Sequence, residues 1–167
     1  MPSKRRQRGD SRGNELLEAA LGYAEQGIRV IPLHGINRQG RCTCGRAKCS
    51  TPGKHPRTRR GLDDATKDAT QIRKWWKQWP EASIAGVLGD RYVAVDVDVK
   101  KGNEGVESLR DLEDECGEFP KTATVKSGEY EGRRGSHFYF TTEASINTKN
   151  GFREGIDIRG RRGYVVL

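Results

Sequence analysis

The chain has 167 residues, of which 33% are hydrophobic and 32% charged, with 21 glycines and a formal net charge of +8. This length fits one domain with a modest core, and the absence of a long apolar run from the sequence excludes a membrane-spanning helix. The basic charge favours a polyanionic partner such as nucleic acid, because each neutralised phosphate releases a counterion.

The first segment, residues 1–13, is basic and lacks the apolar stretch of a secretory signal. We predict a disordered arm here, which either contacts phosphate or is only a solvated tail. The cationic side chains in this arm are Lys4, Arg5, Arg6, Arg8 and Arg12.

The remainder, residues 14–167, is predicted to be one α/β (α+β) domain, a mixed sheet with helices on one face. Helices are expected where apolar residues recur every three or four positions, and strands where they alternate or run together. The expected helices cover 14–26, 68–79 and 103–115, and the expected strands 28–33, 83–88, 92–99, 122–126, 136–141, 155–159 and 163–167. Because the last strand ends with the chain, we expect the N-terminal part of a longer replication protein.

Three tryptophans and one cysteine are interpreted as core residues. Trp75, Trp76 and Trp79 fall with Ile72 on one helical face, which favours packing over base stacking. Cys116 lies on the apolar side of the third predicted helix, which indicates a buried thiol and not a metal ligand.

The segment YVAVDVDV (92–99) carries the most functional information. Side chains alternate along a strand, so the four valines share one face and Asp96 and Asp98 share the other. Two carboxylates about 6–7 Å apart repel each other at neutral pH, and a divalent cation removes that repulsion. The pair suits Mg²⁺ or Mn²⁺, although a lone Asp-x-Asp also occurs on solvated sheet faces and in calcium loops.

The same alternation occurs in GSHFYF (135–140) and GIDIRG (155–160). His137 lies out of phase with Phe138 and Phe140, and Asp157 and Arg159 lie out of phase with the neighbouring isoleucines. A sheet with an apolar back and a charged front explains all three segments, although a lone histidine in such a segment is more often structural. We expect the three aspartates to bind two divalent ions, and His137 and Arg159 to donate hydrogen bonds to a phosphate-bearing ligand.

These segments, in this order, resemble the archaeo-eukaryotic primase superfamily, specifically the bifunctional primase-polymerase (Prim-Pol) N-terminal domains of plasmid, phage and mobile-element replication proteins. The resemblance covers about residues 16–167 and rests on Val95-Asp96-Val97-Asp98, Gly135-Ser136-His137 and Ile156-Asp157. It implies an RNA-recognition-like catalytic core in which the three aspartates hold two ions that align a nucleoside triphosphate and the primer 3′ hydroxyl.

The resemblance also implies an enzyme, a DNA-directed primase/polymerase. Its partners would be a single-stranded DNA template, a primer strand and NTP or dNTP, with a helicase domain expected in the full-length protein. The nucleotide-binding residues that the resemblance implies are Ser136, His137, Arg133, Arg134 and Arg159. Ser136 departs from the family motif, because it adjoins the histidine instead of preceding it by two positions. Which of Arg133 and Arg134 reaches phosphate stays open.

Residues 34–66 form a long segment without periodic apolar residues, and such a segment needs a stabilising interaction of its own to fold. Within it we predict a zinc stem at 40–60, because three cysteines and one histidine make a closed tetrahedral site; His34 is expected to lie outside it. The predicted ligands are Cys42, Cys44, Cys49 and His55, and the predicted DNA-binding residues beside them are Lys54, Arg57, Arg59 and Arg60. The alternatives to a zinc site are a redox thiol cluster or free cysteines, and the alternative to DNA binding is a solvated basic loop. Because the sequence lacks a secretion signal, we expect the cysteines to be in a reducing cytoplasm, which favours a metal site over disulfides.

Other functions share part of this pattern. A metal-dependent nuclease would use the same carboxylates, and a zinc-containing nucleic-acid-binding module would need none of them. A glycosyltransferase could hold Mn²⁺ and a nucleotide-sugar with Asp-x-Asp, but the cysteine cluster, the basic charge and the Asp157 strand would then have no purpose.

Overall fold

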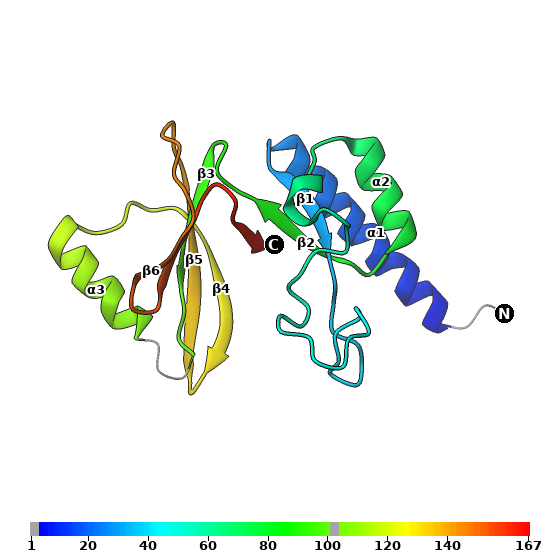
Figure 1. The fold of residues 1–167 in the computed structure, drawn as a ribbon, viewed down its shortest axis with the longest axis horizontal. Coiled ribbons are helices and arrows are strands. Elements are labelled where there is room, and N and C mark those ends of the chain that lie inside the picture. Colours follow the sequence, from blue (N-terminus) through cyan, green and yellow to red (C-terminus); the bar gives the residue numbers. More distant parts are fainter. Residues whose placement is uncertain (1–3, 101–103) are drawn as a thin grey trace. The chain divides into compact units, whose positions relative to one another are not determined.

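A computed structural model describes residues 4–100 and 104–167, with side chains from residue 13 onward. The chain forms two compact units, each of which contains a sheet (Figure 1). The first unit ends at Val87 and also includes Val165–Leu167, and the second spans Leu88–Tyr164. The prediction of a single sheet is therefore wrong, and an RNA-recognition-like core stays a prediction.

The first unit has a small sheet and two α-helices. Its strands run in the order β1-β2-β8, and β1 pairs antiparallel with β2. Its elements are α1 (Lys4–Glu25), β1 (Arg29–Leu33), a 3₁₀ turn η1 (Gly61–Asp64), α2 (Ala69–Gln78), β2 (Ser83–Val87) and β8 (Tyr164–Val166).

The apolar faces of α1 and α2 form the core of the first unit together with its sheet. Ile72, Trp75 and Trp76 are buried against Ala20 of α1 and Val30 of β1, which confirms that these two tryptophans are core residues. Trp79 packs at the edge of the same cluster. Burial of large aromatic side chains therefore stabilises this unit, as the periodicity predicted.

The second unit is built on a five-stranded antiparallel sheet, in the order β4-β5-β3-β7-β6. Its strands are β3 (Tyr92–Val97), β4 (Ala123–Tyr130), β5 (Arg133–Thr141), β6 (Lys149–Arg153) and β7 (Ile156–Arg159), and its helix is α3 (Gly105–Cys116). The central strand β3 thus has neighbours on both sides, which places its side chains in the middle of the sheet.

One face of this sheet is apolar. Val95 and Val97 of β3 and Ile156 of β7 are buried, and Leu109 of α3 and Phe138 of β5 pack against them. The alternation predicted for 92–99 is confirmed, because all four valines there are buried while Asp96 and Asp98 are only partly so. The apolar face therefore lies against α3, and the polar phase of the strands lies on the other face.

Several element boundaries differ from the sequence-based expectation. Helix α1 begins at Lys4 and not at Asn14, while residues 1–3 of the predicted arm lie outside the described residues. Strand β6 was not predicted at all. Cys116 is exposed, so the prediction of its burial is wrong: it is the last residue of α3, where the helix leaves the sheet.

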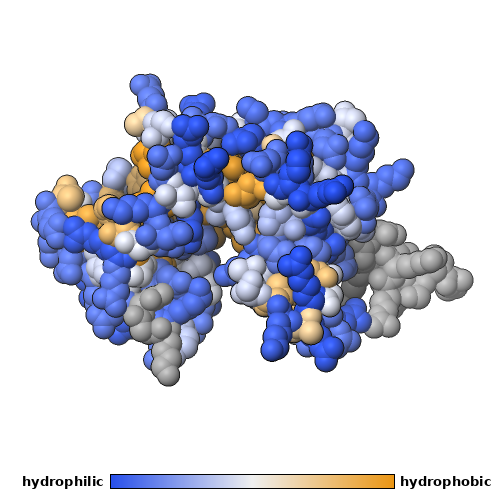
Figure 2. Space-filling model, in the orientation of Figure 1, coloured by the Kyte–Doolittle hydropathy of each residue, from blue (hydrophilic) through white to orange (hydrophobic). Residues whose placement is uncertain are grey.

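Most side chains on the face seen in Figure 2 are hydrophilic, in keeping with the charged composition. Among the described residues, none of the helices has the length and apolar character needed to cross a membrane.

Replacing Ile156 by alanine is expected to lower the free energy of unfolding by about 2–4 kcal/mol, because Ile156 is only 1% exposed and its removal leaves a cavity under the sheet. Urea unfolding would measure the change. Val125→Ala on β4 is the matched control, since Val125 is 49% exposed and should lose almost nothing. Equal losses in the two variants would contradict this account of the core.

Candidate active site and metal centre

Three of the predicted active-site residues are lateral neighbours in the second unit's sheet. Asp96 of β3 stands directly opposite His137 of β5 on one side and Asp157 of β7 on the other. Directly opposed residues in antiparallel strands have Cβ atoms about 4.5–5.5 Å apart, so the three side chains share one small area of the polar face. Sequence periodicity predicted their face, and strand register brings them together.

Hydrogen bonds connect this group. His137 Nε2 lies 3.0 Å from Asp96 Oδ1, and the Tyr139 hydroxyl lies 3.4 Å from His137 Nδ1. The Arg159 Nη2 donates to Asp157 Oδ2 at 2.6 Å and to Asp96 Oδ2 at 3.2 Å. We call Asp96, His137, Asp157 and Arg159 the carboxylate face. With His137 neutral its formal charge is −1, because Arg159 offsets only one of the two aspartates.

Asp98 lies just beyond the end of β3. Its backbone N–H donates to the Gly155 carbonyl at 2.8 Å, which fixes the chain beside the β6–β7 turn. Its carboxylate is 2.8 Å from the Lys100 ammonium. The structure thus brings Asp96 and Asp157 together, while the Asp98 side chain is paired with a cation of its own.

Two residues that the sequence did not single out support the site from β6. Asn150 Oδ1 accepts a hydrogen bond from Arg159 Nη1 at 2.8 Å, and the Gly151 N–H donates to Asp157 Oδ1 at 2.6 Å. Neither could be found from the sequence, because the segment KNGFR has no clear alternation and reads as a loop.

The surroundings of Asp96 act on its pKa in opposite directions. Burial works to raise the pKa, but the hydrogen bond and charge of His137 and the guanidinium of Arg159 outweigh it and hold the Asp96 pKa below its ordinary value. Asp96 therefore stays ionised in neutral solution, as a cation-binding carboxylate must.

This shift makes the stability of the second unit depend on pH. A lowered folded-state pKa means that Asp96 contributes stability above its unfolded value of about 4, and that the contribution disappears as the pH falls through the lower folded value. The difference in unfolding free energy between wild type and Asp96→Asn, measured by urea unfolding, should therefore be largest near pH 6 and begin to shrink as the pH falls through about 4. A difference that stays constant from pH 6 to pH 3 would contradict the assignment.

The donor chemistry of this site fits a divalent ion. Mg²⁺ and Mn²⁺ prefer carboxylate oxygens, and Asp96 and Asp157 present two carboxylates as register partners on a partly exposed face. Asp98, next to the end of the same strand, is a third carboxylate in the vicinity. The residues present are therefore compatible with Mg²⁺ or Mn²⁺.

The other predicted nucleotide-binding residues are placed differently. Ser136 is 5% exposed, stands opposite Val97 and accepts from Lys126 Nζ at 3.0 Å, on the other phase of β5 from His137. This position does not support a nucleotide contact by Ser136, because alternation turns it away from the carboxylate face. Arg133 and Arg134 are exposed and pair with Glu107 and Glu129 respectively.

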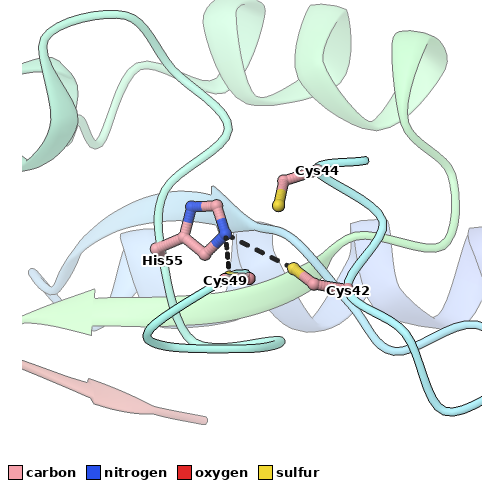
Figure 3. A group of neighbouring side chains, drawn as sticks. All are labelled: Cys42, Cys44, Cys49 and His55. Atoms are coloured by element: carbon pink, nitrogen blue, oxygen red, sulfur yellow. Dashed lines mark hydrogen bonds between the residues drawn. The ribbon is translucent and has the colours of Figure 1, made fainter. Parts of the chain in front are cut away.

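The first unit contains a compact metal-ligand group. Cys42, Cys44, Cys49 and His55 each offer one ligand atom, and these atoms all lie within 4.8 Å of one another. Figure 3 shows the His55 imidazole facing the thiols, with Nε2 3.3 Å from Cys42 Sγ and 3.4 Å from Cys49 Sγ. Within the described part of the chain, this Cys3His set is the only group of three or more His, Cys, Asp or Glu residues whose ligand atoms lie that close together.

The chemistry of the set fits zinc. Three thiolates and an imidazole form a closed tetrahedral structural site. Burial works to raise the Cys42 pKa, but the backbone N–H groups of Gly53 and Cys44 lower it to about 6, so this thiol readily becomes the thiolate that zinc requires. The predicted ligand set is able to hold zinc.

The loop that carries these ligands, residues 34–57, is attached to β1 by a short network. The Thr43 hydroxyl contacts His34 Nδ1 at 3.1 Å and Arg57 Nη2 at 3.1 Å, and Arg57 Nε donates to the Leu33 carbonyl at 3.0 Å. His34 packs beside the His55 ring and lies outside the ligand group, as predicted. Thr43 was missed, because a lone threonine in a loop gives no sequence signal.

Three of the four predicted DNA-binding residues, Arg57, Arg59 and Arg60, line one open pocket of about 560 Å³ in the first unit. Arg57 lies over the Trp79 ring, 5.6 Å from its centroid, and Arg60 forms an ion pair with Asp64 at 2.8 Å. Arg59 and Lys54 are exposed. Arg57 is therefore partly used in holding the loop, whereas Arg59 faces solvent beside the pocket.

The family of the chain follows from its similarity to known proteins. None of the curated proteins compared with it matches. The family model of the bifunctional DNA primase/polymerase N-terminal domain matches residues 20–167, a range that contains both the carboxylate face and the Cys3His loop. On this match the chain belongs to the family of bifunctional DNA primase/polymerase N-terminal domains.

Proposed function

We propose that this protein is an enzyme that makes and extends primers on single-stranded DNA during replication of a plasmid, phage or other mobile element. Membership of the primase/polymerase family implies nucleotide and nucleic-acid substrates. The observation that carries the proposal is the register of the second unit's sheet, which sets Asp96 between His137 and Asp157.

The carboxylates would supply the ligands of two catalytic ions, Mg²⁺ or Mn²⁺, with Asp98 as the third ligand. When bound, such ions neutralise phosphate charge and lower the pKa of the attacking 3′ hydroxyl. Phosphoryl transfer needs little covalent work from the protein, so the side chains act by alignment and charge.

The remaining polar residues would hold the substrates. Asp96 and Tyr139 orient the His137 ring, and His137 would contact the triphosphate. Arg133 and Arg134, at the exposed start of β5, would meet phosphate groups at that end of the strand.

The Cys3His loop would have a structural role. We propose that it holds one zinc ion, and that the cationic residues beside it bind the DNA. Arg59 and Lys54 are exposed there, and the Trp79 ring and Arg57 border the same pocket. Exposed cationic side chains of this kind suit the phosphates of a single strand.

A single assay separates the proposal from its alternatives. The zinc-loaded protein is incubated with a 5′-labelled primer on a single-stranded template, with dNTP or NTP and Mg²⁺ or Mn²⁺. A polymerase lengthens the primer, a nuclease shortens it, and a nucleic-acid-binding module leaves its length unchanged. Primer synthesis on an unprimed template then tests whether the chain alone also starts new strands.

A further inference from the structure

The Arg159 guanidinium lies between the two carboxylates of the proposed catalytic centre. Its Nη2 atom is 2.6 Å from Asp157 Oδ2 and 3.2 Å from Asp96 Oδ2, and its Nε is 3.3 Å from the same Asp96 oxygen. One nitrogen therefore bridges two aspartates that belong to neighbouring strands. A cation that bound both carboxylates would have to use the same region.

The remaining oxygens of these carboxylates also have donors. Asp96 Oδ1 faces His137 Nε2 at 3.0 Å, and Asp157 Oδ1 accepts from the Gly151 N–H at 2.6 Å. All four carboxylate oxygens are thus engaged, and only the two Oδ2 atoms share a partner. Of these donors, Arg159 is the one with a permanent charge and a flexible side chain, so it is the partner that can move without disturbing the sheet.

We propose that Arg159 is an internal counter-cation that competes with the divalent ion for Asp96 and Asp157. This inference rests on the proposed function, because it takes the two aspartates as metal ligands. Two cations cannot share the same pair of oxygens without strong repulsion, so ion binding displaces the guanidinium. Arg159 thereby keeps the carboxylates in place and weakens their affinity for the ion.

A second contact gives the displaced side chain somewhere to stay. Arg159 Nη1 donates to Asn150 Oδ1 at 2.8 Å, and Asn150 is exposed on the edge strand β6. A guanidinium released by the aspartates can therefore remain at the polar face of the sheet. There its planar donors suit the phosphates of a nucleoside triphosphate. Binding of the ion and of the nucleotide would then favour each other. The ion takes the carboxylates that Arg159 leaves, and the nucleotide takes the Arg159 guanidinium that the carboxylates release.

The test compares Mn²⁺ affinity in Arg159→Gln and Arg153→Gln. Both variants lose one positive charge from the β6–β7 hairpin, but Arg153 is paired with Glu115 and contacts neither aspartate in the interactions described. We expect Arg159→Gln to bind Mn²⁺ on the order of tenfold more tightly than Arg153→Gln, the effect of one charge-assisted hydrogen bond. Free Mn²⁺ is measured by electron paramagnetic resonance with zinc-loaded protein. Equal or weaker binding by Arg159→Gln overturns the inference.

A second measurement follows ion binding in the wild-type protein itself and uses a variant only to assign one resonance. Mg²⁺ is titrated into ¹⁵N-labelled protein while the Arg159 Nε–Hε resonance, assigned with Arg159→Lys, is followed. A shift that saturates with Mg²⁺ supports displacement, and a resonance unchanged at saturation overturns it. A wild-type protein that binds neither ion overturns the metal site and this inference together, whereas primer extension with unchanged Arg159 behaviour overturns this inference alone.

Discussion

Replacing Asp96 by asparagine is expected to lower the rate of primer extension on the order of a thousandfold. The substitution keeps the size and shape of the side chain, but it removes the negative charge that a divalent ion needs and turns one accepting oxygen into an NH2 donor. Loss of one such ligand costs several kcal/mol of transition-state stabilisation, and each ~1.4 kcal/mol is a factor of ten in rate. Single-turnover extension of a labelled primer measures the change.

Asp114→Asn is the matched control for this experiment. Asp114 is an exposed aspartate on α3 in the same unit, so its replacement changes the charge equally but leaves the carboxylate face intact. It should extend primers at the wild-type rate. The unfolding transition of Asp96→Asn near neutral pH verifies that the variant is folded. Extension at more than a tenth of the wild-type rate by a folded Asp96→Asn protein would rule out Asp96 as a catalytic ligand.

Replacing Cys42 by serine is expected to abolish zinc binding and to lower the first unit's melting temperature by roughly 10 °C or more. Cys42 is 7% exposed and contacts both His55 and the Gly53 N–H, so it is the innermost member of the ligand group. The loop around it has few apolar contacts of its own, and metal binding to such a segment is a large part of its folding free energy. Zinc content and differential scanning calorimetry measure the two effects.

Cys116→Ser is the control for the loss of a thiol. Cys116 is exposed at the end of α3 and lies outside the ligand group, so zinc content and melting temperature should both be unchanged. Removal of zinc from the wild-type protein with a chelator should reproduce the Cys42→Ser transition. A Cys42→Ser protein that keeps one zinc ion per chain would show that the cluster is not the zinc site.

Side-chain alternation was a reliable guide to which residues face the site. The phase of Asp96 against the valines, and of His137 against the two phenylalanines, follows from the two-residue repeat of a strand and holds in any sheet. The grouping of Cys42, Cys44, Cys49 and His55 could likewise be predicted from the sequence, because three cysteines and a histidine close together in one loop suit a shared metal ion.

Turns and edge strands were harder to predict. Strands β4 and β5 continue to a tight turn at Glu131–Gly132, where both residues have positive φ values of 50° and 76°. Such a turn matches the twist of a hairpin, but Glu-Gly is a weaker signal for it than Asn-Gly. The glycine-rich segment around it therefore reads as a loop in the sequence. Strand β6 was missed for a similar reason, because its segment KNGFR has no clear alternation. The contacts of Asn150 were missed with it.

By itself, the sequence determined the polar and apolar faces of the strands, the metal-ligand set of the loop and the order of the motifs that matches the family. Only the tertiary structure decided that the strands form two sheets, that Asp157 stands beside Asp96, and that Arg159 bridges the two. The physical reason is that periodicity depends on the geometry of one strand, whereas pairing depends on backbone hydrogen bonds between segments far apart in the chain.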